Sequence, residues 1–277
     1  MLNAFTTSDN VQLTVNITGE GSPLIFLHGW TANHNDWREY AEALSDQHTC
    51  YCWNARGHGR HKLSRTAEAN IGRMAKDLRE LIQFYKLKNP ILLGHSMGAL
   101  TIWEYIHRFG CDQISKLCLV DQSPRLLTSN EWEHGIYGDF SAPSNEAFIR
   151  QLEDDFSEAV LRLVADGNNP RTRKSYADNT PQIQKVREYL SKLDPEPLIS
   201  IWKSLSLVDY REILPKITVP TLLVYGDESQ FYSVELAQYV RDSIPDAQLH
   251  VYHGTDHSPH LWQKERFIED LRTFTQA

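Results

Sequence analysis

Short apolar segments alternate with helical segments along most of this chain, and this alternation limits the possible folds more than any other feature. Segments typical of strands lie at 3–9, 11–18, 24–27, 49–53, 90–93, 116–120, 219–226 and 247–254. Between them run stretches with apolar residues at helical spacing, such as the stripe from Ile71 to Tyr85. Repeated strand–helix units favour a mostly parallel sheet covered by helices on both faces. We therefore predict an α/β fold with an eight-stranded, mostly parallel sheet, closed by a last helix from about Ser258 to Phe274.

The alternation is interrupted once, after Pro124. The segment 124–205 is polar, rich in both charge signs and helix-prone. We predict that it forms a helical cap inserted after the sixth strand, while 1–123 and 206–277 form the core. No linker separates the two parts, so the cap is interpreted as an insertion and not as a second folding unit.

The charge balance argues against several kinds of partner. The 277 residues carry a formal net charge of −8 and the pI is near 5.8, so nucleic acid and anionic membranes are repelled on average. No apolar stretch approaches the roughly 20 residues that cross a bilayer, and the N-terminal segment lacks a basic block followed by an apolar one. We expect a cytoplasmic protein with a small-molecule partner. The oligomeric state stays open, a homo-oligomer included.

Neither a cofactor nor a metal is predicted. The sequence contains no nucleotide-binding loop and no cluster with metal-ligand spacing. Cys50 and Cys52 fall in one strand, too far apart for a disulfide, and Cys118 lies in an apolar run. The four cysteines, Cys111 included, are therefore expected to be buried and reduced.

The segment Gly94-His95-Ser96-Met97-Gly98 carries the clearest chemical signal. It follows an apolar strand and precedes a helical pattern, which is the strand–turn–helix setting of a nucleophile elbow. The two glycines suit a sharp turn that holds the serine in a strained conformation. Ser96 is therefore the predicted nucleophile.

Four motifs occur in the order and at the spacing found in the α/β-hydrolase superfamily, and the resemblance covers nearly the whole chain. They are His28-Gly29-Trp30, Arg56-Gly57-His58-Gly59, the segment around Ser96, and Asp256-His257. The chain most resembles single-domain serine esterases, enol-lactone hydrolases, carbon–carbon bond hydrolases and haloperoxidase-like members. The resemblance implies an oxyanion hole formed by the backbone N–H groups of Met97 and Trp30.

A serine needs a neighbouring base, and histidine has a suitable pKa. His257 follows the last strand, where the resembling family carries its base, and its ordinary pKa predicts an acid limb of activity at roughly pH 6–7. His28 and His95 are interpreted as structural or pocket-lining residues. His58 and His61 are interpreted as solvated loop histidines.

Two carboxylates compete for the acid that orients His257. Asp227 follows the seventh strand, but the family's usual Gly-x-x-Asp position, counted from Gly226, is Ser229 here. Asp121 ends the sixth strand, from which some members take their acid. We favour Asp121 and keep Asp227 as the alternative. A loop-capping role for Asp121, through backbone N–H groups after it, is also open.

A serine at position 96 argues against the dehalogenases and epoxide hydrolases of this fold, which use aspartate there. We predict a hydrolase that cleaves a carboxylic ester, lactone or thioester through an acyl-enzyme on Ser96. A ligand receptor without turnover and a cofactor-free oxygenase or perhydrolase on the same fold are the alternatives. Aromatic residues of the cap are candidates for the pocket wall: Trp132, Tyr137, Phe140, Phe148 and Trp202.

Overall fold

The computed structural model describes residues 2–59, 63–64 and 66–276, and its centre is one eight-stranded sheet. The strands lie in the order β1-β2-β4-β3-β5-β6-β7-β8. β1 pairs with β2 and β2 with β4 in antiparallel fashion, and the remaining neighbours are parallel. The structure therefore confirms the predicted fold class. The strands are β1 (Leu2–Thr6), β2 (Gln12–Thr18), β3 (Ser22–Leu27), β4 (His48–Trp53), β5 (Ile91–His95), β6 (Lys116–Val120), β7 (Thr221–Gly226) and β8 (Ala247–Tyr252).

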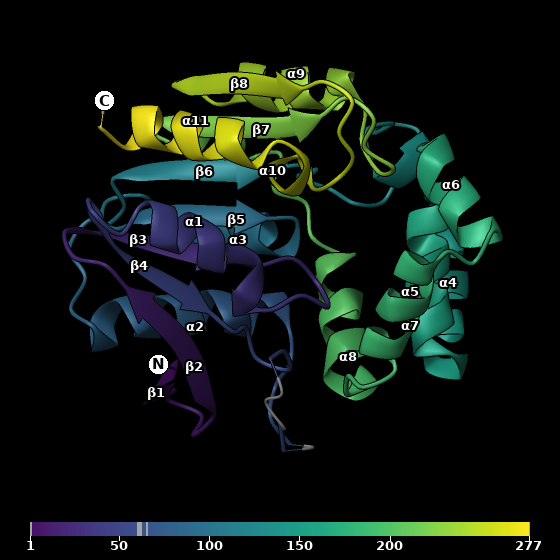
Figure 1. Cartoon of the computed structure of the whole chain (residues 1–277), viewed down its shortest axis with the longest axis horizontal. Helices are drawn as coiled ribbons and strands as arrows, with labels where there is room; N and C mark the ends of the chain where they lie inside the picture. The colour runs from purple at the N-terminus through teal and green to yellow at the C-terminus, as the bar shows by residue number, and fades with distance from the viewer. Residues whose placement is uncertain (1, 60–62, 65, 277) are drawn as a thin grey trace.

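Helices cover both faces of the sheet (Figure 1). The core helices are α1 (Arg38–Ala43), α2 (Ile71–Phe84), α3 (Met97–Phe109), α9 (Val234–Ser243), α10 (Pro259–Trp262) and α11 (Lys264–Gln276). Alternate residues of β3 point to opposite faces, so Leu24 belongs to the cluster that includes α1 and α11, whereas Ile25 belongs to the cluster on the other face, with α2, α3 and α9. Burial on both faces explains why the central strands are continuous apolar runs.

The C-terminal helix differs from the prediction of one helix. Gln263, at φ −121° and ψ 60°, separates α10 from α11. The backbone turns at this residue, and Tyr40 of α1 donates a hydrogen bond to the carbonyl of His260. The helix is therefore interrupted where α10 contacts α1, and the apolar spacing of the sequence did not indicate this interruption.

The segment 124–205 contains five α-helices that gather beyond one end of the sheet (Figure 1). They are α4 (Ala142–Asp154), α5 (Phe156–Ala165), α6 (Pro170–Ala177), α7 (Pro181–Leu190) and α8 (Pro195–Leu205). Side chains of Ser141, Asp155, Asn169 and Asp194 accept N–H bonds at the starts of α4, α5, α6 and α8. The described residues also form three short 3-10 helices: η1 (His34–Trp37), η2 (Ile136–Gly138) and η3 (Leu214–Lys216).

A buried ion-pair network anchors the segment after β4. The guanidinium of Arg56 is fully buried and donates to both carboxylate oxygens of Asp77 on α2, at 2.6 and 2.7 Å. Arg56 also contacts Asp9, and Arg73 contacts Asp77. These contacts hold residues 54–59, which directly follow β4, against α2.

Among the described residues, Cys50, Cys52, Cys111 and Cys118 are free and buried. No helix in this part of the chain is long and apolar enough to cross a membrane.

Candidate active site

Ser96 occupies a strained turn between β5 and α3. Its φ is 51° and its ψ is −115°, a backbone conformation that a residue with a side chain rarely adopts. A β-carbon at Gly94 would lie 2.5 Å from the carbonyl carbon of Gly98, and one at Gly98 would lie 2.3 Å from the carbonyl oxygen of Leu27. Both glycines are therefore required for α3 to approach β5 and β3 this closely. The turn leaves the Ser96 side chain on the wall of a cavity.

His257 and Asp121 meet beside this turn. Asp121 directly follows β6, and its Oδ1 lies 2.8 Å from Nδ1 of His257, which follows β8. The carboxylate also accepts hydrogen bonds from the N–H of Gly226 and the hydroxyl of Ser229, both at 2.9 Å. This contact makes Nδ1 the protonated nitrogen and leaves Nε2 of His257 able to accept a proton. The loop-capping alternative for Asp121 is wrong, because its carboxylate oxygens bond to these three groups and not to residues 122–125.

The competing carboxylate contacts a different histidine. Asp227 lies 2.8 Å from Nδ1 of His253, whose side chain is 84% exposed. Asp227 also accepts the N–H of Gly254, so it supports the turn after β8. The position that usually bears an acid, Ser229, instead donates to Asp121.

Two backbone N–H groups near Ser96 have no hydrogen-bond acceptor within the described part of the chain. They belong to Met97, at the start of α3, and Trp30, after β3. Buried backbone N–H groups are rarely left unpaired. Both residues line the cavity beside Ser96, so their N–H groups are able to bind an oxyanion there.

Histidines brace the loop that carries Trp30. His28 is buried, with Nδ1 on the carbonyl of Gly29 and Nε2 accepting the N–H of Ala55. His58 accepts the N–H of Thr31, and its ring lies 4.9 Å from that of His28. The prediction of a solvated His58 is therefore wrong, because the side chain is buried against the loop that carries Trp30 and Thr31. His61, predicted to be solvated as well, lies outside the described residues.

Burial controls the charges of the site. It lowers the pKa of His257 to about 4, so the imidazole is uncharged at neutral pH. Burial raises the pKa of Asp121 to about 7, while the hydrogen bonds from Gly226 and Ser229 act in the opposite direction. Burial therefore disfavours charge on both groups, and the contact between Nδ1 of His257 and Oδ1 of Asp121 couples their protonation.

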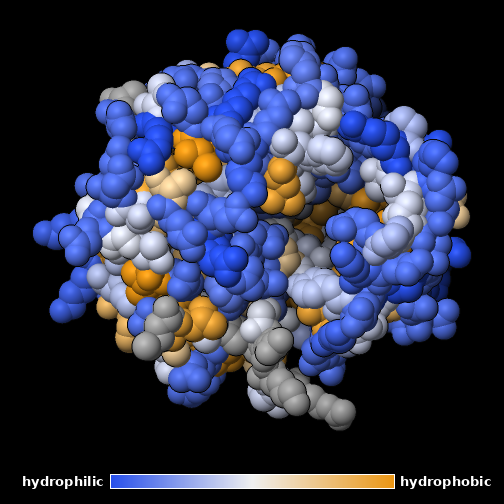
Figure 2. All heavy atoms as spheres, in the orientation of Figure 1, coloured by the Kyte–Doolittle hydropathy of each residue, from blue (hydrophilic) through white to orange (hydrophobic). Residues whose placement is uncertain are grey.

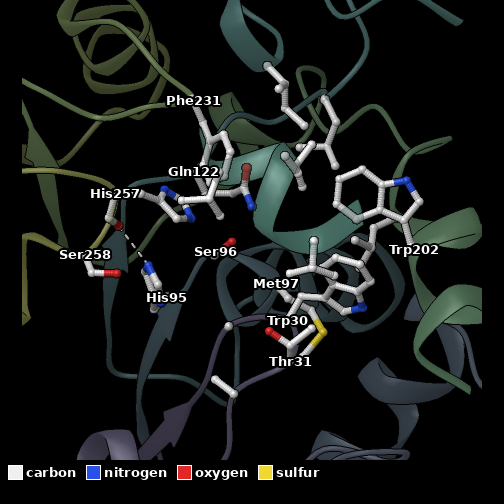
Figure 3. Close-up of a pocket in the computed structure, with 18 of the residues that line it drawn as sticks. Trp30, Thr31, His95, Ser96, Met97, Gln122, Trp202, Phe231, His257 and Ser258 are labelled. Carbon is white, nitrogen blue, oxygen red and sulfur yellow. Dashed lines mark hydrogen bonds between the residues drawn. The ribbon is translucent and has the colours of Figure 1, made fainter. Parts of the chain in front are cut away.

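Two contacts that the sequence did not indicate hold the backbone of His257. Its N–H donates to Oε1 of Gln230 at 2.9 Å. Its carbonyl accepts a hydrogen bond from Nε2 of His95, also at 2.9 Å, as Figure 3 marks. The place of His95 directly before Ser96 in the sequence could have indicated a residue near the site. No local pattern in the sequence identifies Gln230.

Ser96 and His257 line one cavity of about 240 Å³ between the sheet and the helices of the 124–205 segment. Figure 2 shows a hollow in this region, with hydrophobic residues at depth and hydrophilic residues around the rim. Of the five predicted aromatic wall residues, only Trp202 lines the cavity. The 124–205 segment contributes mainly aliphatic side chains, among them Val160, Leu163 and Val164 of α5 and Leu205 of α8.

The other four aromatic residues pack elsewhere. Phe148 lies behind Trp202, at 4.9 Å between ring centroids, and Phe140 packs on Phe148. Tyr137 packs on Phe231 and donates to the carbonyl of Leu163, and Trp132 packs on Tyr239. The prediction of these four as wall residues is wrong, because residue type alone does not tell which face of the cap a side chain meets.

Within the described ranges, no group of three or more histidine, cysteine, aspartate or glutamate side chains is placed to hold a metal ion.

Comparison with known proteins assigns the fold to a family. A family model described as alpha/beta hydrolase fold matches residues 22–264, and the chain belongs to this family. It is similar to a pimeloyl-[acyl-carrier protein] methyl ester esterase of Vibrio atlanticus (strain LGP32), with 26% identity over 268 residues, 94% of this chain and 96% of that protein. It is also 26% identical to a non-heme chloroperoxidase of Kitasatospora aureofaciens, over 97% of this chain and 98% of that protein. Among solved structures, an esterase from Exiguobacterium antarcticum superposes with a TM-score of 0.85 at 25% identity, over 100% of both chains.

Proposed function

We propose that this protein is a serine hydrolase that cleaves a carboxylic ester, lactone or thioester of small to medium size. The observation that carries the proposal is the placement of a strained Ser96 and the His257–Asp121 pair on one cavity. The esterases among its relatives support the same reaction class. A cavity of about 240 Å³ supports a small-molecule substrate.

In the proposed reaction, Oγ of Ser96 attacks the acyl carbonyl carbon while Nε2 of His257 removes the hydroxyl proton. The N–H groups of Met97 and Trp30 bind the oxyanion that forms. The bond to the leaving oxygen then breaks, and His257 returns the proton to the departing alcohol. Water attacks the acyl-enzyme with His257 again as base, which releases the acid and restores Ser96.

Asp121 acts through His257 and does not touch the substrate. Its carboxylate keeps the Nδ1 proton in place, so Nε2 is left to accept the proton of the serine, and its charge stabilises the imidazolium. Ser229 and the N–H of Gly226 hold this carboxylate in turn. The acid of the proposed triad therefore comes from β6.

The proposal is tested by labelling with a fluorophosphonate and by turnover of p-nitrophenyl butanoate. We expect one labelled residue, Ser96, and loss of both labelling and turnover in Ser96→Ala. Ser191→Ala, on the exposed end of α7, is the matched control and should keep both. Labelling without turnover of any ester would favour a ligand receptor. Oxygen-dependent activity that survives in Ser96→Ala would favour a cofactor-free oxygenase.

A further inference from the structure

A buried amide faces the cavity beside the proposed nucleophile. Gln122 directly follows Asp121 at the end of β6, and only 3% of its surface is exposed. Its side chain lines the cavity, and Figure 3 shows it near Ser96 and His257. The proposed triad does not use this residue.

The orientation of the amide is determined by its neighbours. Oε1 of Gln122 accepts the N–H of Ser123 at 2.7 Å and the hydroxyl of Tyr232. A backbone N–H donates only, so the atom that faces Ser123 has to be the carbonyl oxygen. The NH₂ group therefore lies on the other side of the amide, toward the cavity, as drawn in Figure 3.

This NH₂ group has no acceptor within the part of the chain that the structure describes, although the opposite end of the same amide bonds twice. The donor opens on a largely apolar cavity whose described lining gives it no acceptor, so a ligand that supplies one pairs this group. Because Ser123 and Tyr232 already hold the amide, such a ligand gains a hydrogen bond with little loss of side-chain entropy.

The rest of the cavity defines the kind of acceptor. Its wall is largely apolar, with Leu126, Ile136, Val160 and Leu163 among the lining residues. No lysine or arginine is among the described lining residues, and Asp36 adds a carboxylate. A substrate carboxylate would lose its hydration here without gaining a cation, so an uncharged oxygen is favoured.

We propose that Gln122 is a specificity-determining residue that selects esters with an uncharged oxygen acceptor, such as an ether, oxo or hydroxyl group, close to the scissile carbonyl. This inference rests on the proposed hydrolase function. The acceptor belongs either to the acyl chain or to the alcohol, and the experiment separates these two sources.

The test compares esters that differ only by an oxygen in place of a methylene group. The acyl pair is p-nitrophenyl methoxyacetate and p-nitrophenyl butanoate, and the alcohol pair is methoxyethyl butanoate and butyl butanoate. For each pair, kcat/KM of the oxygenated ester is divided by kcat/KM of its methylene analogue. The readout is this ratio for the wild type divided by the same ratio for Gln122→Met. This double ratio cancels the intrinsic reactivity of each ester.

We expect the preference for the oxygenated ester to fall roughly tenfold in Gln122→Met, in the pair whose oxygen reaches the amide. Gln122→Glu keeps an acceptor for Ser123 and Tyr232 and should lose the preference as well, which separates the missing donor from a loss of folding. Gln83→Met, an identical change on the exposed side of α2, should leave both ratios unchanged. Ratios that stay the same in both pairs for both Gln122 variants would overturn the inference.

Binding to Ser96→Ala, measured by calorimetry with the same esters, separates the two proposals. If the wild type hydrolyses none of the esters, the hydrolase function fails, while a binding preference that depends on Gln122 would still support the selectivity. If the esters are hydrolysed and the ratios do not change, the selectivity proposal alone fails.

Discussion

At the level of single residues, the acid that orients His257 offers the sharpest test of the proposed chemistry. Asp121 and Asp227 follow neighbouring strands, β6 and β7, and each contacts a histidine at 2.8 Å. Only Asp121 contacts the histidine that shares a cavity with Ser96. The two carboxylates are therefore close in the fold but have separable roles.

We predict that Asp121→Asn lowers kcat by about three to four orders of magnitude, because an amide favours the wrong tautomer of His257 and does not balance the imidazolium. Asp227→Asn, which affects the exposed His253, is the matched control and should have far less effect. Both are measured on one p-nitrophenyl ester. A large loss in Asp227→Asn beside a mild one in Asp121→Asn would reverse the assignment.

Ser229 makes a rescue experiment possible. Its hydroxyl lies 2.9 Å from the carboxylate oxygen of Asp121 that contacts His257. A carboxylate at position 229 therefore starts close to Nδ1 of His257. We predict that Asp121→Asn combined with Ser229→Asp recovers part of the kcat that Asp121→Asn loses, and equal kcat values for the single and double variants would contradict this.

The pH dependence should also differ from that of an ordinary histidine. His257 has to be neutral to accept a proton, and burial lowers its pKa from 6.5 to about 4, while the charge of Asp256 acts in the opposite direction. We predict that kcat/KM falls with acid at a midpoint below 6.5, so that activity persists at lower pH than the sequence indicates. Steady-state rates with near-UV circular dichroism at each pH provide the measurement. A midpoint at or above 6.5 would contradict the effect of burial.

At the level of elements, α5 and α8 shape the cavity and also contact the loop that carries Trp30. The indole of Trp30 donates to the carbonyl of Leu198 on α8 at 3.0 Å, and its ring lies 4.9 Å from that of Trp202. The same helices that form the wall thus hold the side chain of Trp30, whose N–H is proposed to bind the oxyanion. Substitutions in α5 and α8 are therefore expected to change substrate specificity more than they change the stability of the core.

We predict that Val164→Phe, which adds volume to the wall formed by α5, shifts activity toward shorter acyl chains. The cavity of about 240 Å³ leaves little room for both a phenyl ring and a long chain. Relative kcat/KM across a series of p-nitrophenyl esters is the measurement. Val186→Phe on α7, outside the cavity, is the control, and an equal change for every chain length would indicate a packing defect instead.

At the level of the whole molecule, the ion pairs around Arg56 join segments that are far apart in sequence. The side chains of Arg56 and Asp77 are both 0% exposed. Each charge therefore needs the other to offset the cost of removing it from water. The segment that they anchor also contains His58, which supports the loop of Trp30. Stability and site geometry are therefore linked through this network.

We predict that Asp77→Ala lowers the free energy of unfolding by about 3–5 kcal/mol, because Arg56 stays buried without its main partner. Asp178→Ala removes an exposed partner of Lys174 and should change stability by less than about 1 kcal/mol. Urea denaturation of both variants is the measurement. Similar small losses in the two variants would show that the buried pair contributes little.

What the sequence by itself determined was local or periodic. Alternating apolar and helical segments indicate the parallel sheet, because strand and helix periods are visible in the chain. The two glycines around Ser96 indicate a tight turn, because only glycine permits the close approach of α3 to β5. The position of His257 after the last strand follows from the same order of elements.

Only the tertiary structure decided which carboxylate meets His257, that His58 is buried, and that the 124–205 segment lines the cavity mainly with aliphatic residues. Asp121 and Asp227 both follow strands at the same edge of the sheet, so order along the chain does not separate them. The difference arises from contacts between residues that are far apart in sequence, such as the 136 positions between Asp121 and His257. Such contacts depend on how the loops pack, and no local pattern encodes that packing.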